Sequence, residues 1–186
     1  LRERGFSIKI IDADAEGWGA KETVQKIIEY NPLIIGIGVL GANPSASSTP
    51  KMIGVRYILT LLKEKKCSAK TILYGIHPSA LPEKTLKEEG SDFVCRGEPF
   101  EPITKLLEQL KVKNQDYINI KGLCYLKDGK LVDQGWSDVI QDLDSLPFVA
   151  WDLLPMDKYR AHNWHCFGDI EHRLQYAIVY SSLGCP

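Results

Sequence analysis

The sequence predicts a doubly wound α/β fold, in which helices cover both faces of a parallel β-sheet. From residue 6 to about residue 110, short apolar runs alternate with amphipathic segments, which is the pattern of repeated βα units. The stretch LIIGIGVL at 33–40 is apolar at nearly every position, so we expect both of its faces to be covered. With 44% hydrophobic residues in a chain of 186, the sequence can build a core of this kind.

The predicted strands are FSIKIID, LIIGIGVL, KTILYG and DFVCRG, at 6–12, 33–40, 70–75 and 92–97, and we expect all four to be parallel. The predicted helices carry apolar residues three and four positions apart. Their apolar faces are Val24, Ile27 and Ile28; Met52, Val55, Leu59 and Leu62; and Phe100, Ile103, Leu106, Leu107 and Leu110. Thr49 is the expected N-cap of the second helix and Pro50 its first residue, and a fourth, shorter helix should follow Pro82.

A different pattern begins near residue 113. In IKGLCYLKDGKLV, Asp128 and Gly129 separate two short extended runs and favour a type I′ hairpin turn. We expect this hairpin, at 113–135, to be a separate small unit outside the main sheet. Residues 136–176 show neither the helical nor the strand spacing of apolar residues, which predicts an extended linker. Phe148, Trp151 and Leu154 are expected to pack this linker against the domain.

The composition argues against several classes of partner. The 23 basic and 24 acidic residues give a net charge of -1, so the charge favours neither a nucleic acid nor an anionic membrane surface. The longest apolar stretch is too short to span a bilayer. Five widely spaced cysteines do not resemble the disulfide framework of a secreted protein, so we expect a reducing cytoplasm. Three of them, Cys67, Cys95 and Cys124, are interpreted as small apolar residues.

A literal dinucleotide motif is excluded by its context. G-x-G-x-x-G occurs at Gly36, Gly38 and Gly41, but these glycines lie inside or at the end of a strand, and ANPSASST separates them from Pro50. In a dinucleotide site the helix begins directly behind the glycines, so that its N-terminus meets the pyrophosphate. A phospho-acceptor domain is also disfavoured, because neither an isolated aspartate nor a lysine after a later strand is evident.

Glycines inside a strand need a reason, because they weaken it unless something approaches the backbone closely. For Gly36, close packing of a helix is as good an explanation as a ligand. Gly38 and Gly41 lie where the carboxyl end of a parallel strand is expected, which is where open α/β sheets bind ligands. The sequence therefore predicts a site at the carboxyl ends of the strands.

Two histidine features leave alternatives open. His77 can be a metal ligand, a cofactor contact or a loop histidine, of which the loop histidine is the commonest outcome. The cluster HNWHC at 162–166 contains zinc ligands, but its spacing is cramped and no second ligand pair lies near it.

Both ends of the sequence predict a piece of a longer protein. Residue 1 is a leucine, and LRERG reads as the last turn of a helix closed by Gly5. The chain stops at SSLGCP, where Cys185 follows what reads as a strand beginning another module.

Six stretches follow one another along the chain: ERGFSIKIIDADAEG, PLIIGIGVL, ILYGIHPSALPE, SDFVCRGEPFE, LDSLPFVAWDLLP and SSLGCP. Their succession resembles the N-terminal half of the cobalamin-dependent radical SAM enzymes. The resemblance implies a Rossmann-like, flavodoxin-like cobalamin-binding domain at 1–112 that lacks its first strand, and the start of a radical SAM barrel at 177–186. It implies that Cys185 is the first ligand of a 4Fe–4S cluster that binds S-adenosylmethionine in the full-length protein. This fragment would be inactive alone, whereas the parent would act on a small-molecule substrate as an oxidoreductase or methyltransferase.

The same resemblance implies a cobalamin site along the strand ends. Its expected residues are Asp12, Ala13, Gly38, Leu40, Gly41, Gly75, His77, Gly97 and Glu98. The sequence departs from the better-known form of the family, since Gly38-Val39-Leu40 stands in place of S-x-L and Tyr74-Gly75 in place of G-G. The alternative is a degenerate scaffold that binds no cobalamin and docks a substrate or partner.

Overall fold

The computed structural model describes residues 1–40, 49–112, 117–161, 172–177 and 179. The chain divides into two units. The larger is the continuous segment Ala20–Leu143, and the smaller joins Leu1–Gly19 to the segment from Asp144 onward.

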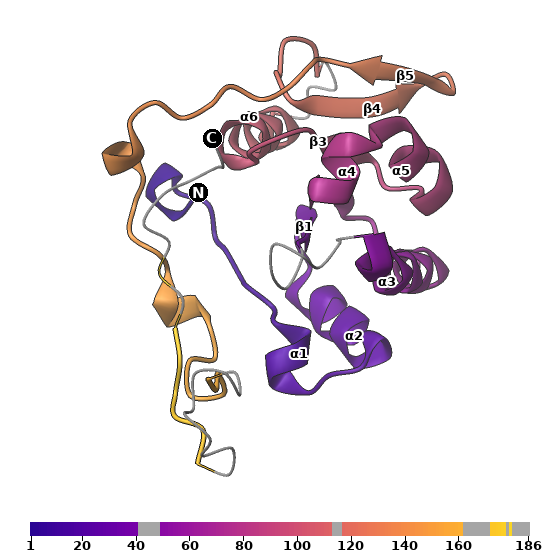
Figure 1. The fold of residues 1–186 in the computed structure, drawn as a ribbon. Coiled ribbons are helices and arrows are strands. Elements are labelled where there is room, and N and C mark those ends of the chain that lie inside the picture. The colour runs from indigo at the N-terminus through magenta and orange to yellow at the C-terminus, as the bar shows by residue number, and fades with distance from the viewer. Residues whose placement is uncertain (41–48, 113–116, 162–171, 178, 180–186) are drawn as a thin grey trace. The chain divides into compact units, whose positions relative to one another are not determined.

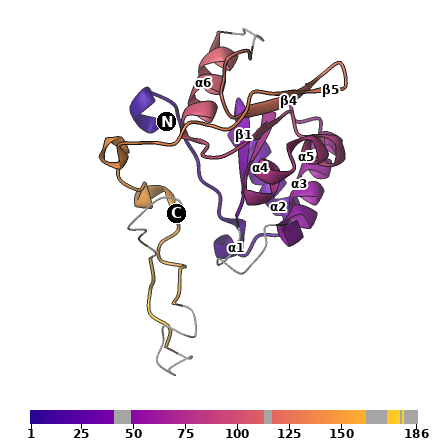
Figure 2. The ribbon, with the colours of Figure 1, turned by 45° about the horizontal axis from the view of Figure 1, so that its top comes forward.

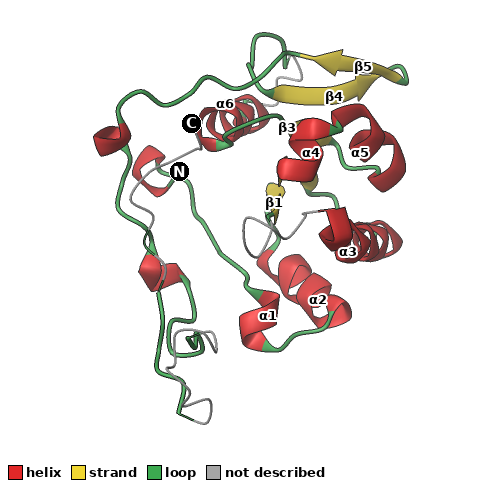
Figure 3. Cartoon of the chain, in the orientation of Figure 1, coloured by secondary structure: helices red, strands yellow, loops and turns green. Residues whose placement is uncertain are grey.

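The larger unit is built on a five-stranded sheet whose strands follow one another in chain order. Figure 3 draws the strands in yellow and the helices in red. The strands are β1 (Ile34–Val39), β2 (Lys70–Gly75), β3 (Phe93–Cys95), β4 (Leu123–Lys127) and β5 (Lys130–Asp133). The first three are parallel, and β4 and β5 are antiparallel to their neighbours. Of the four strands predicted to be parallel, three are present, and the α/β fold class is confirmed.

The helices of this unit confirm the predicted apolar faces. They are α2 (Ala20–Tyr30), α3 (Met52–Glu64), α4 (Ile76–Ala80), α5 (Pro82–Glu89) and α6 (Phe100–Lys111). All four predicted core residues of α3 are buried, as are Leu106 and Leu107 of α6, whereas Phe100 at the start of α6 is exposed. The α-helix α3 begins later than predicted, because a 3-10 turn at Thr49–Lys51 precedes it. The short helix α4 was not predicted.

Helices cover the two faces of the sheet unequally (Figure 2). On one face, Ile72, Phe93 and Leu123 pack with Leu106 of α6. The helices α2 to α5 lie on the opposite face (Figure 1). The prediction that both faces of β1 are covered is wrong in part, because Ile35 and Val39 are buried but Gly36 and Gly38 are exposed.

The predicted hairpin turn is confirmed, but its place is not as expected. Asp128 and Gly129 have φ angles of 50° and 74°, and these positive values at both central positions are those of a type I′ turn. The hairpin does not lie outside the main sheet. Residues Phe93–Cys95 of β3 pair with Leu123–Tyr125 of β4, so the hairpin continues the sheet. Leu123 and Cys124 are both fully buried in this position, which stabilises the pairing.

The smaller unit is formed by short turns rather than regular strands. Residues 6–12, predicted to be a strand, have no strand partner among the described residues. A β-strand is defined by hydrogen bonds to a neighbour, so an apolar run without one forms no strand. The predicted closing glycine is confirmed, since Gly5 ends the 3-10 helix Arg2–Arg4 with a φ of 77°.

The linker prediction is partly wrong. Trp151 and Leu154 are half-buried, but the side chain of Phe148 is fully exposed and does not anchor the segment. The smaller unit is instead joined by polar contacts between its two segments. Arg2 forms an ion pair with Asp152 at 2.9 Å, and Lys158 forms another with Glu16. In the part of the chain that the structure describes, no helix has the length and apolar character needed to cross a membrane.

Candidate functional site at the carboxyl ends of the strands

The parallel strands of the larger unit end in exposed apolar side chains. Leu40 follows β1 directly and is 59% exposed, and Ile76 follows β2 directly and is 66% exposed. Phe100, which begins α6 a few residues after β3, is 41% exposed. We take this edge as the candidate site, because open α/β sheets bind ligands at the carboxyl ends of their strands and these apolar side chains are accessible there. Leu40 was among the residues that the sequence predicted for the site, whereas Ile76 and Phe100 were not.

Gly75 closes β2 in a conformation that essentially only glycine adopts. Its φ and ψ angles are 115° and -170°. In the register of the sheet Gly75 lies opposite Val39, the last residue of β1. A Cβ atom at Gly75 would lie 2.8 Å from the carbonyl carbon of Val39 and closer still to its oxygen. Gly75 therefore lets the ends of β1 and β2 meet at the site.

The glycines of β1 are explained by a neighbouring side chain. A Cβ atom at Gly38 would lie 3.0 Å from the hydroxyl oxygen of Tyr74, and one at Gly36 would lie 3.6 Å from the same ring. Burial raises the pKa of Tyr74, and the nearby Cys95 thiol adds a smaller contribution. The Tyr74 ring therefore lies over Gly36 and Gly38, which is neither of the two reasons that the sequence left open for Gly36.

The segment after β3 is held by Ser79 of α4. Ser79 is 7% exposed, and its hydroxyl oxygen accepts a hydrogen bond from the Gly97 amide at 3.0 Å. The same hydroxyl donates to the carbonyl oxygen of Cys95 at 3.4 Å. Gly97 has a φ of 90°, which favours glycine. Ser79 escaped sequence reasoning, because a serine between apolar residues gives no indication of the strand it will contact.

The predicted site residues fall into three groups. Six of them lie at or just beyond the carboxyl ends of β1, β2 and β3: Gly38, Leu40, Gly75, His77, Gly97 and Glu98. Asp12 and Ala13 belong to the smaller unit. Gly41 and Cys185 lie outside the described residues, as does the HNWHC cluster. Within the described ranges, no three His, Cys, Asp or Glu side chains come together as metal ligands would.

Asp12 makes two structural hydrogen bonds within the smaller unit. One carboxylate oxygen accepts from the Ala15 amide at 3.0 Å and caps α1 (Ala13–Glu16). The other accepts from the Tyr159 hydroxyl at 2.7 Å. Burial, followed by this hydrogen bond, raises the pKa of Tyr159 to about 12. Asp12 thus connects the two segments of this unit.

Two thiols beside the site are expected to be unreactive. Burial, with a smaller effect of Glu98, raises the pKa of Cys95 to about 12, and burial and Asp133 raise that of Cys124 to about 12. At about pH 8.5, iodoacetamide should therefore alkylate the half-buried Cys67 and leave both of these thiols unmodified. Peptide mass spectrometry measures this directly, and guanidinium chloride should make all three react. If Cys95 in the folded protein were alkylated as fast as Cys67, this prediction would be wrong.

The same pKa shifts give a direction to the pH dependence of stability. An unfolded chain releases these two protons near the ordinary thiol pKa of about 8.5, whereas the folded chain keeps them. The stabilising contribution is therefore fully present below about pH 8.5 and is lost as the pH rises toward 12.

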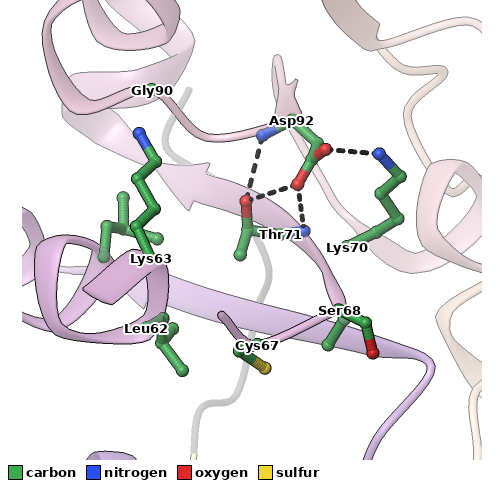
Figure 4. Close-up of a pocket in the computed structure, with 10 residues that line it drawn as sticks. Leu62, Lys63, Cys67, Ser68, Lys70, Thr71, Gly90 and Asp92 are labelled. Atoms are coloured by element: carbon green, nitrogen blue, oxygen red, sulfur yellow. Dashed lines mark hydrogen bonds and ion pairs between the residues drawn. The ribbon is translucent and has the colours of Figure 1, made fainter. Parts of the chain in front are cut away.

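A pocket of about 240 Å³ lies at the opposite end of the sheet (Figure 4). Its charged groups already have structural partners. Asp92 accepts hydrogen bonds from the Thr71 amide at 2.8 Å, the Thr71 hydroxyl at 2.9 Å and the Lys70 ammonium at 2.7 Å. Lys63 places its ammonium against Gly90, the C-cap of α5, where a helix favours positive charge. Because α/β sheets bind ligands at the carboxyl ends of their strands, this pocket is not the candidate site.

The fold is that of an α/β domain whose three parallel strands end at one edge of the sheet. Residues 1–107 match the B12 binding domain family, and the chain belongs to this family. This confirms the family expected from the sequence.

Two relatives of this chain carry the names of enzymes. An uncharacterized methyltransferase of Pyrococcus horikoshii is 29% identical over 180 residues, covering 96% of this chain and 35% of the relative. The anaerobic magnesium-protoporphyrin IX monomethyl ester cyclase of Synechocystis sp. is 27% identical over 188 residues, covering 100% of this chain and 34% of the relative. The chain therefore spans about a third of the length of these relatives.

Two solved structures share the fold. The radical S-adenosylmethionine methyltransferase TsrM from Kitasatospora setae, solved with cobalamin and a 4Fe–4S cluster, matches with a TM-score of 0.60 and 15% identity over 76% of this chain and 25% of that chain. The cobalamin-dependent S-adenosylmethionine radical enzyme OxsB was solved with aqua-cobalamin and S-adenosylmethionine. It matches with a TM-score of 0.59 and 19% identity over 74% of this chain and 18% of that chain. At these identities the likeness shows the fold alone.

Proposed function

We propose that this domain binds cobalamin at the carboxyl ends of β1, β2 and β3. The observation that carries the proposal is that an exposed apolar residue follows each of the three parallel strands: Leu40 after β1, Ile76 after β2 and Phe100 after β3. A corrin ring is broad and flat and has large apolar faces, so it fits several strand ends better than one deep pocket. Membership of the B12 binding domain family supports the same conclusion.

The residues present fit such a ligand, and each type has a distinct task. Leu40, Ile76 and Phe100 would contact the apolar surface of the ring and exclude water from it. Gly75 and Gly97 would set the course of the backbone beside the ring, because each lets another part of the chain, Val39 or Ser137, pack against it. His77 and Glu98 would supply polar contacts at its edge. Bound cobalamin supplies methyl-transfer and radical chemistry that protein side chains lack.

In the full-length protein, we propose that this domain serves a cytoplasmic radical SAM enzyme. Residues 1–112 would form the cobalamin domain, 113–135 its hairpin and 136–176 a linker, with a radical SAM barrel beginning at 177–186. The barrel would hold the cluster and S-adenosylmethionine, with Cys185 as one ligand. The reaction on a small-molecule substrate would be methyl transfer, ring cyclisation or a related radical step. The greater length of the two named relatives supports this arrangement.

A second candidate function has one observation in its favour. The Tyr74 ring occupies part of the space beside Gly36 and Gly38, and the better-known form of the family has a glycine in place of Tyr74. A domain without this space can be a scaffold that binds no cobalamin and docks a substrate or partner.

Titration of the full-length protein with hydroxocobalamin distinguishes these functions. We expect saturable changes in the visible spectrum, and retention of the cobalamin through gel filtration. Leu40→Glu should weaken binding by about tenfold or more, because it places a charge against an apolar ring. Leu33→Glu is the matched control, since Leu33 is also exposed but precedes the same strand. The absence of binding by the unmodified protein at micromolar concentrations, or equal effects of the two variants, would overturn the proposal.

A further inference from the structure

Arg96 joins four parts of the larger unit at the edge of the candidate site. It lies between β3 and Gly97. Its guanidinium forms an ion pair with Asp133 of β5, donates from Nε to the carbonyl oxygen of Ser79 in α4 at 3.3 Å, and lies 4.7 Å from the centre of the Trp136 ring. Its side chain is only 20% exposed. The guanidinium thus uses its charge, its planar face and a directional donor at once.

The backbone of Arg96 is fixed as firmly as its side chain. Its amide donates to the carbonyl oxygen of Gly122 at 2.8 Å, and its carbonyl oxygen accepts from the Ser137 amide at 2.9 Å. A Cβ atom at Gly97 would lie 2.5 Å from the Ser137 hydroxyl and 3.5 Å from the Trp136 ring. The segment after the hairpin therefore packs directly against Gly97. Because of this contact and the two backbone hydrogen bonds of Arg96, the position of Gly97 is fixed.

We infer that Arg96 is a positioning residue for the corrinoid site. It touches no reacting group itself. By tying Ser79, Asp133 and Trp136 together, it sets where Gly97 and Glu98 lie relative to the strand ends, so the hairpin becomes a support of the site. This inference rests on the proposed function. It adds a role for residues beyond the strand ends, since Asp133 and Trp136 lie outside every segment predicted to form the site.

A second arginine provides a matched control. Arg56 of α3 forms a two-pronged ion pair with Glu89, with Nε–Oε2 and Nη2–Oε1 distances of 2.9 Å and 2.7 Å. Glu89 is buried, so the loss of Arg56 also leaves an unpaired carboxylate in the protein. This pair lies where α5 ends, just before the amino end of β3, and away from Gly97. Loss of either arginine should reduce stability, but only loss of Arg96 should alter the site.

The test measures hydroxocobalamin affinity and thermal unfolding of the full-length protein and its variants. Arg96→Ala should weaken binding by about tenfold, a typical effect of losing a residue that orients a direct contact. Arg56→Ala should change affinity by less than about twofold, because distant sites act independently. Arg96→Lys keeps the charge but loses the planar fork, so it should restore part of the affinity. It also replaces Arg96→Ala in the comparison if that variant does not fold.

The outcomes separate the inference from the proposed function. If the unmodified protein binds and a folded Arg96→Ala variant binds equally well, the positioning role is wrong and the cobalamin site stands. If Arg56→Ala weakens binding as much as Arg96→Ala, general destabilisation explains both, and the inference is overturned. If the unmodified protein does not bind, the proposed function fails and the inference fails with it.

Discussion

Gly75→Ala is expected to destabilise the Ala20–Leu143 unit by about 3 kcal/mol or more, with a fall in Tm of about 10 °C. The φ of 115° and ψ of -170° at this position belong to a region of backbone conformation that is almost exclusive to glycine. The added methyl group would also overlap the carbonyl group of Val39. Relief of that overlap requires β1 and β2 to separate at their carboxyl ends. We therefore expect weaker cobalamin binding together with the lower stability.

Gly54→Ala is the control for this prediction, with an effect of opposite sign. Gly54 lies inside α3, and a Cβ atom there would meet no atom within 4 Å. Alanine should stabilise the helix by about 0.5 to 1 kcal/mol, because glycine loses more backbone freedom on folding. Thermal or urea unfolding of the two variants measures both changes. A Gly75→Ala variant as stable as the unmodified protein would show that the end of β2 is not strained.

On the proposal that the full-length protein is a radical SAM enzyme, Cys185→Ala should abolish its iron–sulfur cluster and its cleavage of S-adenosylmethionine together. Three cysteines leave one iron of a 4Fe–4S cluster free, and S-adenosylmethionine would bind there, so loss of one thiolate removes the cluster that both functions need. Iron content and visible absorption after anaerobic reconstitution, with product analysis, measure the two effects. Cys67→Ala is the control, because this half-buried thiol follows α3 in the other module. A Cys185→Ala protein with a full cluster and normal cleavage would rule out the assignment.

The elements that the sequence predicted well depend on local rules. The apolar faces of α3 and α6 follow from residues three and four positions apart, which meet on one side of any helix. The hairpin turn follows from Asp128 and Gly129, which accept positive φ angles with little strain. The placement of Gly38, Gly75 and Gly97 at one edge follows from the rule that parallel strands end together, whereas their contact with cobalamin was implied by the resemblance and stays a prediction.

The features that were missed depend on which segments meet. Residues 6–12 have the composition of a strand, but composition does not supply a partner strand. The hairpin was expected to stand apart because nothing local indicates that β4 will pair with β3. The Arg96 cluster joins Ser79, Asp133 and Trp136, which are far apart in the sequence. The contact of Tyr74 with Gly38 could have been found, since these two residues lie directly opposite in a sheet whose register the predicted strands nearly define.

The chain order of the strands has a consequence for how the protein folds during synthesis. Each strand from β2 to β5 pairs with the strand made just before it, so the sheet can grow by closing short loops as the chain emerges. The smaller unit cannot form in this way. Its ion pair between Arg2 and Asp152 and its hydrogen bond between Asp12 and Tyr159 span 150 and 147 residues. Residues 1–19 are made before the sheet, but they are therefore among the last to acquire their native contacts.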